Sequence, residues 1–246
     1  MNIMEGFSNI AFICYSHSSY SDVWDMFWGQ LNKYIPIVKK YFFVDKLVKP
    51  VSDDIKVILY EDLLYSDKFL KCLESIKEPF CIYHQEDMVL YNKPNLNKIK
   101  ELTNFIKEYN VDYIKLLKGG HQIDVRLEDM PIDNLFYIPH DPKFLSYANQ
   151  PTIWKTKTLK QIFKNTSNTD IRDFETKASL YMNTTDILGL YWHDNEKKRG
   201  MNHWDSSIYP FGGMIFKGKW VYSEYNTELT QLHKKYNINK NLRGVV

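Results

Sequence analysis

Two adjacent carboxylates, Glu86 and Asp87, stand out in this 246-residue chain because of where they fall. They follow the apolar run from Phe80 to Tyr83, which begins after Pro79 and is typical of a short buried strand. In an open α/β sheet the carboxyl end of such a strand faces the ligand crevice. Two acids there suit a hard divalent cation that shares its oxygen ligands with substrate phosphates. The pattern predicts a metal-diphosphate site, with a solvated loop after a strand as the alternative.

The elements that must position these acids alternate along the chain. Apolar runs typical of strands are separated by patterns with helical spacing, which favours βαβ units and a mostly parallel sheet flanked by helices. Strands are expected at 9–15, 41–44, 56–60, 80–84, 113–117, 135–138, 187–192 and 213–216. Helices are expected at 22–34, 65–76, 95–109, 158–164 and 173–182, with a short one from 226 onward. The predicted fold class is therefore α/β.

The composition narrows the classes of protein to which the chain can belong. Lys and Arg number 32 and Asp and Glu 30, and the net charge of +2 is too small for a dedicated nucleic-acid binder. Aromatic residues make up 15% of the chain, which favours ligands such as sugars and bases. The three cysteines lack metal-ligand spacing, and no apolar run approaches the ~18 residues of a membrane span. We expect a cytoplasmic protein without a transmembrane segment, in the host cytoplasm if the source is a virus.

Several short motifs follow one another along roughly residues 8 to 220. They are Tyr65-Ser-Asp-Lys68, Gln85-Glu-Asp87-Met, Gln150-Pro-Thr-Ile-Trp154, Asp173-Phe-Glu175 and Lys217-Gly-Lys-Trp220. Together they resemble nucleotide-sugar glycosyltransferases of the GT-A type, the small single-domain kind found in bacteria and large DNA viruses. The resemblance implies one GT-A-like, Rossmann-like domain over 1–246. Its nucleotide-sugar-binding half would span about 8–94, its acceptor-binding half about 95–225, and its C-terminal tail 226–246.

The resemblance implies donor-side roles for several residues. Asp87, helped by Glu86, would take the part of the family's DxD motif and hold Mn²⁺ or Mg²⁺, although the sequence here is Gln85-Glu86-Asp87 rather than Asp-x-Asp. Lys68 would contact the diphosphate, with an ordinary solvated helix lysine as the alternative. The nucleotide base and ribose would meet the loop after the first strand and Asp45 after the second. The implied donor-binding residues are Tyr15, Ser16, His17, Asp45, Tyr65, Lys68 and Glu86.

Acceptor-side roles follow from the Phe174-Glu175 motif. Transfer with inversion needs a carboxylate that removes the proton from the acceptor hydroxyl, and Glu175 is the first candidate. Asp173 ranks second because its place on the helix should turn it elsewhere. An acid that only favours a helix N-terminus is the alternative for Glu175. Gln150 and Trp154 are expected to line the acceptor site, although a tryptophan is more often part of the core.

A basic loop at 197–204 is the last candidate element. It contains Lys197, Lys198, Arg199 and His203 around a glycine, and such a loop can close over a diphosphate. We expect Arg199 to contact the donor and His203 to be a late metal ligand, as in some GT-A enzymes. A solvated basic turn with a structural histidine is the alternative.

The predicted function is transfer of a sugar from a nucleotide-diphosphate sugar, with a UDP-sugar favoured, to a glycan or another hydroxyl acceptor. The expected partners are therefore this donor and a glycan or glycoconjugate acceptor, with no nucleic acid. Two alternatives remain at this point. A metal-dependent nucleotidyltransferase would use the same crevice and acids without an acceptor-side base. A non-catalytic carbohydrate-binding protein would keep the aromatic residues and tolerate loss of the acids.

Overall fold

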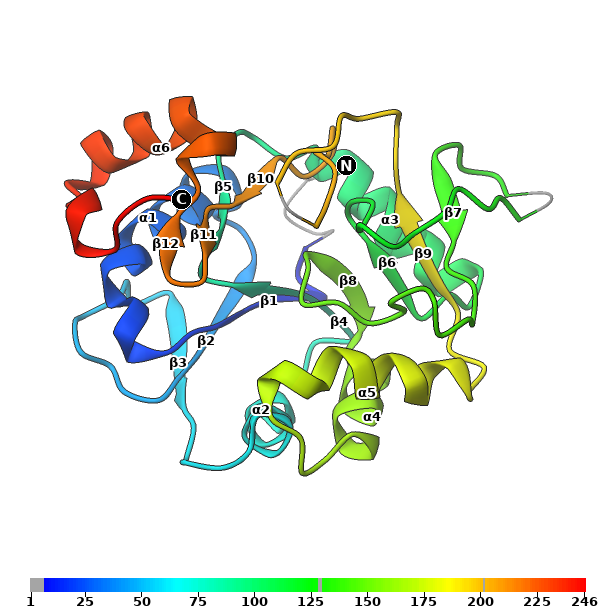
Figure 1. Ribbon diagram of the computed structural model, residues 1–246. Helices are drawn as coiled ribbons and strands as arrows, with labels where there is room; N and C mark the ends of the chain where they lie inside the picture. Colours follow the sequence, from blue (N-terminus) through cyan, green and yellow to red (C-terminus); the bar gives the residue numbers. More distant parts are fainter. Residues whose placement is uncertain (1–6, 128–129, 201) are drawn as a thin grey trace.

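An eight-stranded sheet runs through the computed structural model, which describes residues 7–127, 130–200 and 202–246 (Figure 1). Its strands are β1 (Ile10–Tyr15), β2 (Lys39–Val44), β3 (Ile55–Leu59), β4 (Phe80–Gln85), β6 (Tyr113–Lys115), β7 (Leu135–Tyr137), β8 (Thr152–Lys155) and β9 (Gly189–Trp192). The spatial order is β3-β2-β1-β4-β8-β6-β9-β7. Strands β1 to β4 run parallel, as do β6 and β9, whereas β8 is antiparallel to both neighbours and β7 to β9. The predicted α/β class with a mostly parallel sheet is confirmed.

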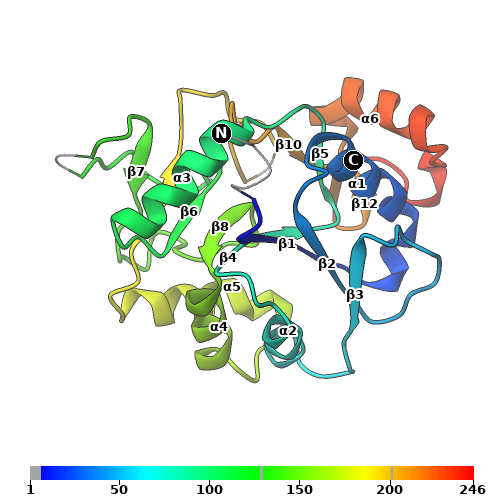
Figure 2. The same cartoon turned by 180° about the vertical axis from the view of Figure 1, so that it is seen from behind.

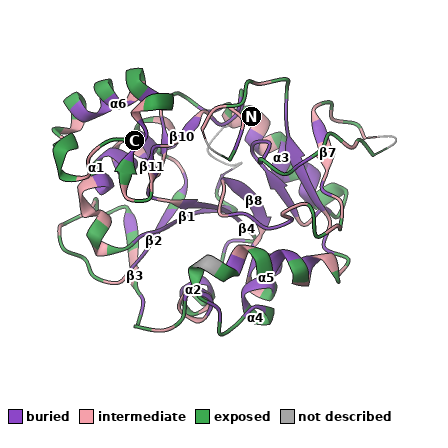
Figure 3. Cartoon of the chain, viewed as in Figure 1, coloured by how far each residue is buried: buried purple, intermediate pink, exposed green. Residues whose placement is uncertain are grey.

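Helices cover both faces of this sheet (Figures 1 and 2). They are α1 (Ser21–Tyr34), α2 (Tyr65–Glu74), α3 (Leu96–Glu108), α4 (Thr156–Asn165), α5 (Ile171–Asn183) and α6 (Tyr222–Tyr236), with the short 3₁₀ turns η2 (Ser18–Tyr20) and η3 (Lys240–Leu242). Side chains alternate along β1, so Phe12 packs in a core with α1, α3 and α6, while Ile13 packs in a second core with α2, α4 and α5. Figure 3 shows that the central strands are buried along their length.

Two small two-stranded sheets complete the structure, and the sequence did not predict their pairing. In one, β5 (Met88–Leu90) pairs with β10 (Phe211–Gly213); in the other, β11 (Ile215–Phe216) pairs with β12 (Lys219–Trp220). The strand expected at 213–216 is divided at Met214, because Phe211–Gly213 pairs with β5 while Ile215–Phe216 pairs with β12. The helix expected from 158 begins at Thr156, directly after β8. Among the described residues, the helices are too short or too polar to cross a membrane.

Candidate active site

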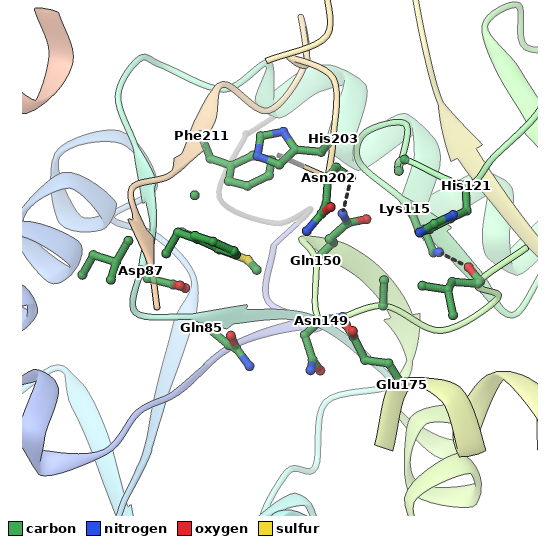
Figure 4. A pocket seen from close by; sticks show the side chains of 18 of the residues that line it. Gln85, Asp87, Lys115, His121, Asn149, Gln150, Glu175, Asn202, His203 and Phe211 are labelled. Atoms are coloured by element: carbon green, nitrogen blue, oxygen red, sulfur yellow. Dashed lines mark hydrogen bonds between the residues drawn. The ribbon is translucent and has the colours of Figure 1, made fainter. Parts of the chain in front are cut away.

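A cavity of about 510 Å³ opens at the carboxyl end of β4 and is lined from both sides of the sheet (Figure 4). The chain segments that reach it lie far apart in the sequence: the turn after β4, strand β6, the segment before β8, helix α5 and the loop at 197–204. Carboxyl ends of parallel strands collect at one edge of a sheet, which is why loops from so many elements meet there. The lining residues with polar side chains include Gln85, Asp87, Lys115, Asn149, Gln150, Glu175, Asn202 and His203.

The two acids form the turn that joins β4 to β5. Asp87 lines the cavity, and its Oδ1 atom is buried without a hydrogen-bond partner in the described part of the chain. Burial raises the pKa of Asp87 to about 6, with the nearby Arg243 guanidinium opposing the shift. Burial, and then the charge of Asp87, raise the pKa of Glu86 well above its usual range. The turn therefore disfavours two negative charges unless a cation joins them.

The residues present fit a divalent cation only in part. The unpartnered Asp87 Oδ1 is an oxygen of the kind that Mg²⁺ or Mn²⁺ binds together with substrate phosphates. Across residues 7–127, 130–200 and 202–246, however, no three His, Cys, Asp or Glu side chains converge as a metal-binding group. His203 Nδ1 lies 3.1 Å from the Trp204 carbonyl oxygen and Nε2 lies 3.3 Å from the Tyr225 hydroxyl. A metal would have to displace one of these contacts to use His203.

The loops that follow β1 and β2 form the predicted base and ribose site. They lie side by side because the two strands are parallel neighbours. The Asp45 carboxylate accepts hydrogen bonds from the amide of Ser18 at 2.6 Å and from its hydroxyl at 2.7 Å. His17 Nε2 lies 3.4 Å from the same carboxylate. Burial acts to raise the pKa of Asp45, but the hydrogen bonds from Ser18 outweigh it and hold the pKa below its usual value. The Asp45 carboxylate is thus a hydrogen-bond acceptor held in place just after the carboxyl end of β2.

An aromatic group lies next to this loop. The Tyr15 ring stacks on Tyr60 at 5.2 Å and meets Tyr65 edge-on at 5.2 Å. The Tyr60 hydroxyl donates to the Ser16 carbonyl at 2.9 Å, and the Lys68 ammonium lies 5.0 Å from the centre of the Tyr60 ring. The predicted donor-side residues of β1, of the loops after β1 and β2 and of α2 therefore lie together, although Tyr15, Ser16 and Tyr65 are buried.

Glu175 projects into the cavity from α5, just after the first turn of that helix (Figure 4). Its Oε1 atom accepts a 2.6 Å hydrogen bond from the backbone amide of Asn149. The preceding Phe174 is fully buried and stacks on Phe163 at 4.2 Å, which fixes the start of the helix. Asp173 is 60% exposed and lies 3.5 Å from Lys177, outside the cavity lining. The structure thus brings Glu175, but not Asp173, to the same hollow as Asp87.

The two residues predicted to line the acceptor site have different positions. Gln150 lines the cavity, where its Nε2 donates to the Asn202 carbonyl at 3.3 Å. Trp154 is fully buried and stacks on Tyr113 at 4.3 Å and on Tyr147 at 5.7 Å. Because β8 is an inner strand with both faces covered, Trp154 belongs to the core and is not assigned to acceptor binding.

The basic loop does not present Arg199 to the cavity, in contrast to the prediction. The guanidinium donates to Glu228 at 2.7 Å and to the Glu224 carbonyl at 3.0 Å, and it lies 4.6 Å from the Tyr225 ring centre. Arg199 therefore attaches the loop to α6, and its contact with a donor stays a prediction. The same loop brings Asn202 and His203 to the cavity wall.

Lys115 is a cavity residue that the sequence analysis missed. It is fully buried on β6, and its ammonium donates to the Leu145 carbonyl at 2.7 Å. Burial lowers its pKa to about 7, while the charge of Glu175 acts in the opposite direction. The available signal was a lysine in the middle of the apolar run from Tyr113 to Leu117. Asn149, which holds Glu175, had no such signal because its amide rather than its side chain makes the contact.

Comparisons with known proteins add little to this geometry. No family model and no curated protein matches the chain. It is similar to 4-diphosphocytidyl-2C-methyl-D-erythritol synthase from Anaerococcus prevotii, with TM-score 0.46, 9% identity and coverage of 78% of this chain and 91% of that one. It is also similar to bifunctional IspDF from Campylobacter jejuni, with TM-score 0.45, 16% identity and coverage of 77% of this chain and 50% of that one. A third similar structure is S. aureus TarS 1–349 in complex with UDP-GlcNAc, with TM-score 0.45, 15% identity and coverage of 77% of this chain and 59% of that one. The chain spans only part of the last two, and scores this low carry no argument about function.

Proposed function

We propose that this chain is a glycosyltransferase that moves a sugar from a nucleotide-diphosphate sugar, with a UDP-sugar favoured, to a hydroxyl of a glycan or another acceptor. The observation that carries the proposal is one cavity with a half-buried acid, Asp87, on one side and a second carboxylate, Glu175, on another (Figure 4). Glycosyl transfer needs such a pair, because charge grows on the leaving diphosphate while a proton leaves the acceptor.

In this proposal the donor occupies the half of the chain at about 8–94. The base and ribose lie against Tyr15, His17 and Asp45, whose carboxylate is already held by Ser18. The diphosphate reaches the turn at Asp87, where Oδ1 has no other partner among the described residues. Asp87, assisted by Glu86, would hold a divalent cation there; when bound, that cation neutralises charge on the diphosphate.

The acceptor occupies the opposite side, formed by residues of the half at about 95–225. Glu175 takes the proton of the acceptor hydroxyl as its oxygen forms a bond to the anomeric carbon. The bond from that carbon to the diphosphate oxygen breaks, and its electron pair leaves with the nucleoside diphosphate. A single displacement of this kind inverts the anomeric centre. The amide of Asn149 keeps the carboxylate oriented during the step.

Incubation with a panel of UDP-sugars and hydroxyl acceptors tests this function. We expect release of UDP that depends on the acceptor, with a product of inverted anomeric configuration by NMR, and loss of release in the Glu175→Gln variant. Pyrophosphate release from a nucleoside triphosphate and a sugar phosphate would instead identify a nucleotidyltransferase. Sugar binding without turnover, unchanged by loss of Asp87 and Glu175, would identify a non-catalytic binding protein.

A further inference from the structure

A second hollow, of about 490 Å³, lies at the opposite end of strand β4 from the candidate active site. It is lined at the amino end of β4 and the carboxyl end of β8, where Phe80 and Lys155 are register partners. Asp87 follows the other end of β4, so the length of that strand, roughly 20 Å, separates the two hollows. The second hollow therefore belongs to a separate place on the molecule.

Lysines from several elements converge on this hollow. They come from the segment after α2, from α3, from β8 and from α4: Lys77, Lys107, Lys155, Lys157 and Lys160. Lys155 donates to Asn110 at 2.7 Å and lies 3.7 Å from Asp112, and Lys160 donates to the Ile76 carbonyl at 3.0 Å. Within the described residues, the other three lysines form no hydrogen bond or ion pair through their ammonium groups.

The one acid in the lining does not neutralise this charge. Glu78 is 5% exposed, accepts a hydrogen bond from Lys39 at 2.7 Å and another from the Tyr41 hydroxyl at 3.0 Å. Its charge is thus already matched by a cation outside the lining. The chain as a whole has a net charge of only +2, so the positive charge gathered here is a local concentration.

Helix α4 begins in the same hollow with the wrong charges for a helix start. Its N-cap residue, Lys155, makes no side-chain capping hydrogen bond, and its first turn contains no acid. The first amides of a helix lack intrahelical partners and carry positive partial charge, so anions are favoured there and lysines are not. Thr156, at this start, is 4% exposed and lines the hollow. Its amide donates to the Pro79 carbonyl at 2.9 Å, whereas its hydroxyl makes no hydrogen bond of normal geometry in the described structure. The amides that remain for an anion in the described first turn are therefore those of Lys157 and Thr158.

We propose that this hollow is a binding site for the phosphate group of a soluble organic phosphate. The phosphate would lie at the start of α4, among the amides of Lys157 and Thr158 and the ammonium groups of Lys107 and Lys157. The organic part would lie against the apolar wall formed by Ile76, Pro79 and Phe80. We favour a soluble compound over a lipid headgroup because the surface is concave and its apolar wall can contact the organic part of a small ligand.

Titration of the full chain with phenyl phosphate and with inorganic phosphate, followed by backbone amide NMR, tests the site. We expect saturable shifts of the Lys157 and Thr158 amides, distinct from any shift at Asp87, and tighter binding of phenyl phosphate than of inorganic phosphate. The Lys107→Ala/Lys157→Ala variant should bind about 10-fold more weakly. Lys93→Ala/Lys234→Ala removes the same charge from exposed positions elsewhere and should bind as the wild type does.

Three results would overturn the proposal. One is the absence of shifts at the start of α4 with either probe. Another is equal weakening in the two double variants, which would indicate a general charge effect. The third is binding to phosphatidylglycerol vesicles that depends on Lys107 and Lys157 without any binding of phenyl phosphate, which would assign the surface to a membrane. Since none of these readouts involves glycosyl transfer, the test stands apart from the proposed function.

Discussion

The backbone amide of Asn149 donates a 2.6 Å hydrogen bond to Glu175 Oε1 and so ties helix α5 to the segment that leads into β8. The Asn149 side chain is itself held, because its Oδ1 accepts from the hydroxyls of Tyr147 at 3.1 Å and Tyr65 at 3.4 Å. The carboxylate is therefore oriented by rigid elements rather than by a loose surface contact. A group that must meet a substrate proton in one geometry benefits from such support.

Glu175→Gln should remove the base and keep the hydrogen bond, because the amide oxygen of glutamine can still accept from Asn149. We expect kcat to fall by roughly 100- to 10,000-fold, the usual contribution of a general base, with donor affinity near that of the wild type. Asp173→Asn is the matched control, since Asp173 lies two residues away and outside the cavity lining. A Glu175→Gln enzyme with a near-normal rate, or a product that retains the anomeric configuration, would contradict the assignment.

Asp87→Asn should weaken UDP binding in the presence of Mn²⁺ and lower turnover by about 100-fold or more, the scale for loss of an electrostatic stabiliser. The reason is that Asp87 Oδ1 is buried and has no hydrogen-bond partner in the part of the chain that the structure describes. Calorimetric titration of UDP with Mn²⁺ and with EDTA measures the effect. Equal UDP affinity under both conditions in the wild type would remove the cation from the proposed mechanism.

The stability of the protein should also report on Asp87. Its pKa is raised to about 6 when folded, against about 3.9 for an unfolded aspartate. The folded state therefore holds the proton more tightly, and the stability from this group is present below pH ~4 and lost as the pH rises through ~6. In EDTA, Asp87→Asn should be more stable than the wild type by roughly 1–3 kcal/mol at pH ~7.5 and equally stable at pH ~3.5. Urea unfolding at both pH values checks this; a variant that is less stable at pH ~7.5 would contradict it.

Lys115→Met should stabilise the fold near neutral pH. Burial lowers the lysine pKa to about 7, so the folded state loses its proton while the unfolded state keeps it up to ~10.4. This group therefore destabilises the fold most below pH ~7, and the penalty disappears as the pH rises towards 10. We expect a gain of roughly 1–4 kcal/mol at pH ~6.5, reduced by the lost bond to Leu145, and a smaller gain at pH ~9.5. A gain that grows with pH would show that the ammonium is not the cause.

Arg199→Ala should affect stability rather than donor binding. The guanidinium is 22% exposed and bonds to Glu228 and to the Glu224 carbonyl, so its removal leaves a half-buried carboxylate. We expect a loss of about 1–3 kcal/mol in unfolding free energy. Lys198→Ala, a neighbouring cation on the same loop, should change little. Donor affinity that falls in Arg199→Ala while stability is unchanged would restore the predicted contact with the diphosphate.

The spacing of apolar residues predicted the fold well because it indicates which side of a single helix or strand is buried. The run before Glu86 gave β4, and Phe174 gave the start of α5, since each depends on apolar spacing within a few residues. The contacts that were missed join distant segments. Arg199 meets Glu228 on α6, and the β5–β10 pairing joins residues more than a hundred positions apart. Such pairings depend on the three-dimensional course of the chain, which periodicity does not encode.

Strand β8 runs against both of its neighbours, and this reversal has a consequence for how the chain can vary. The chain leaves the cavity at Gln150, crosses the sheet as Thr152–Lys155 and enters the lysine-lined hollow at the start of α4. Because side chains alternate between the faces of a strand, inserting or deleting one residue here would turn Trp154 out of its stack and displace both ends together. The length of this one strand is therefore fixed by two hollows at once, so neither can be re-engineered by a change of strand length without altering the other.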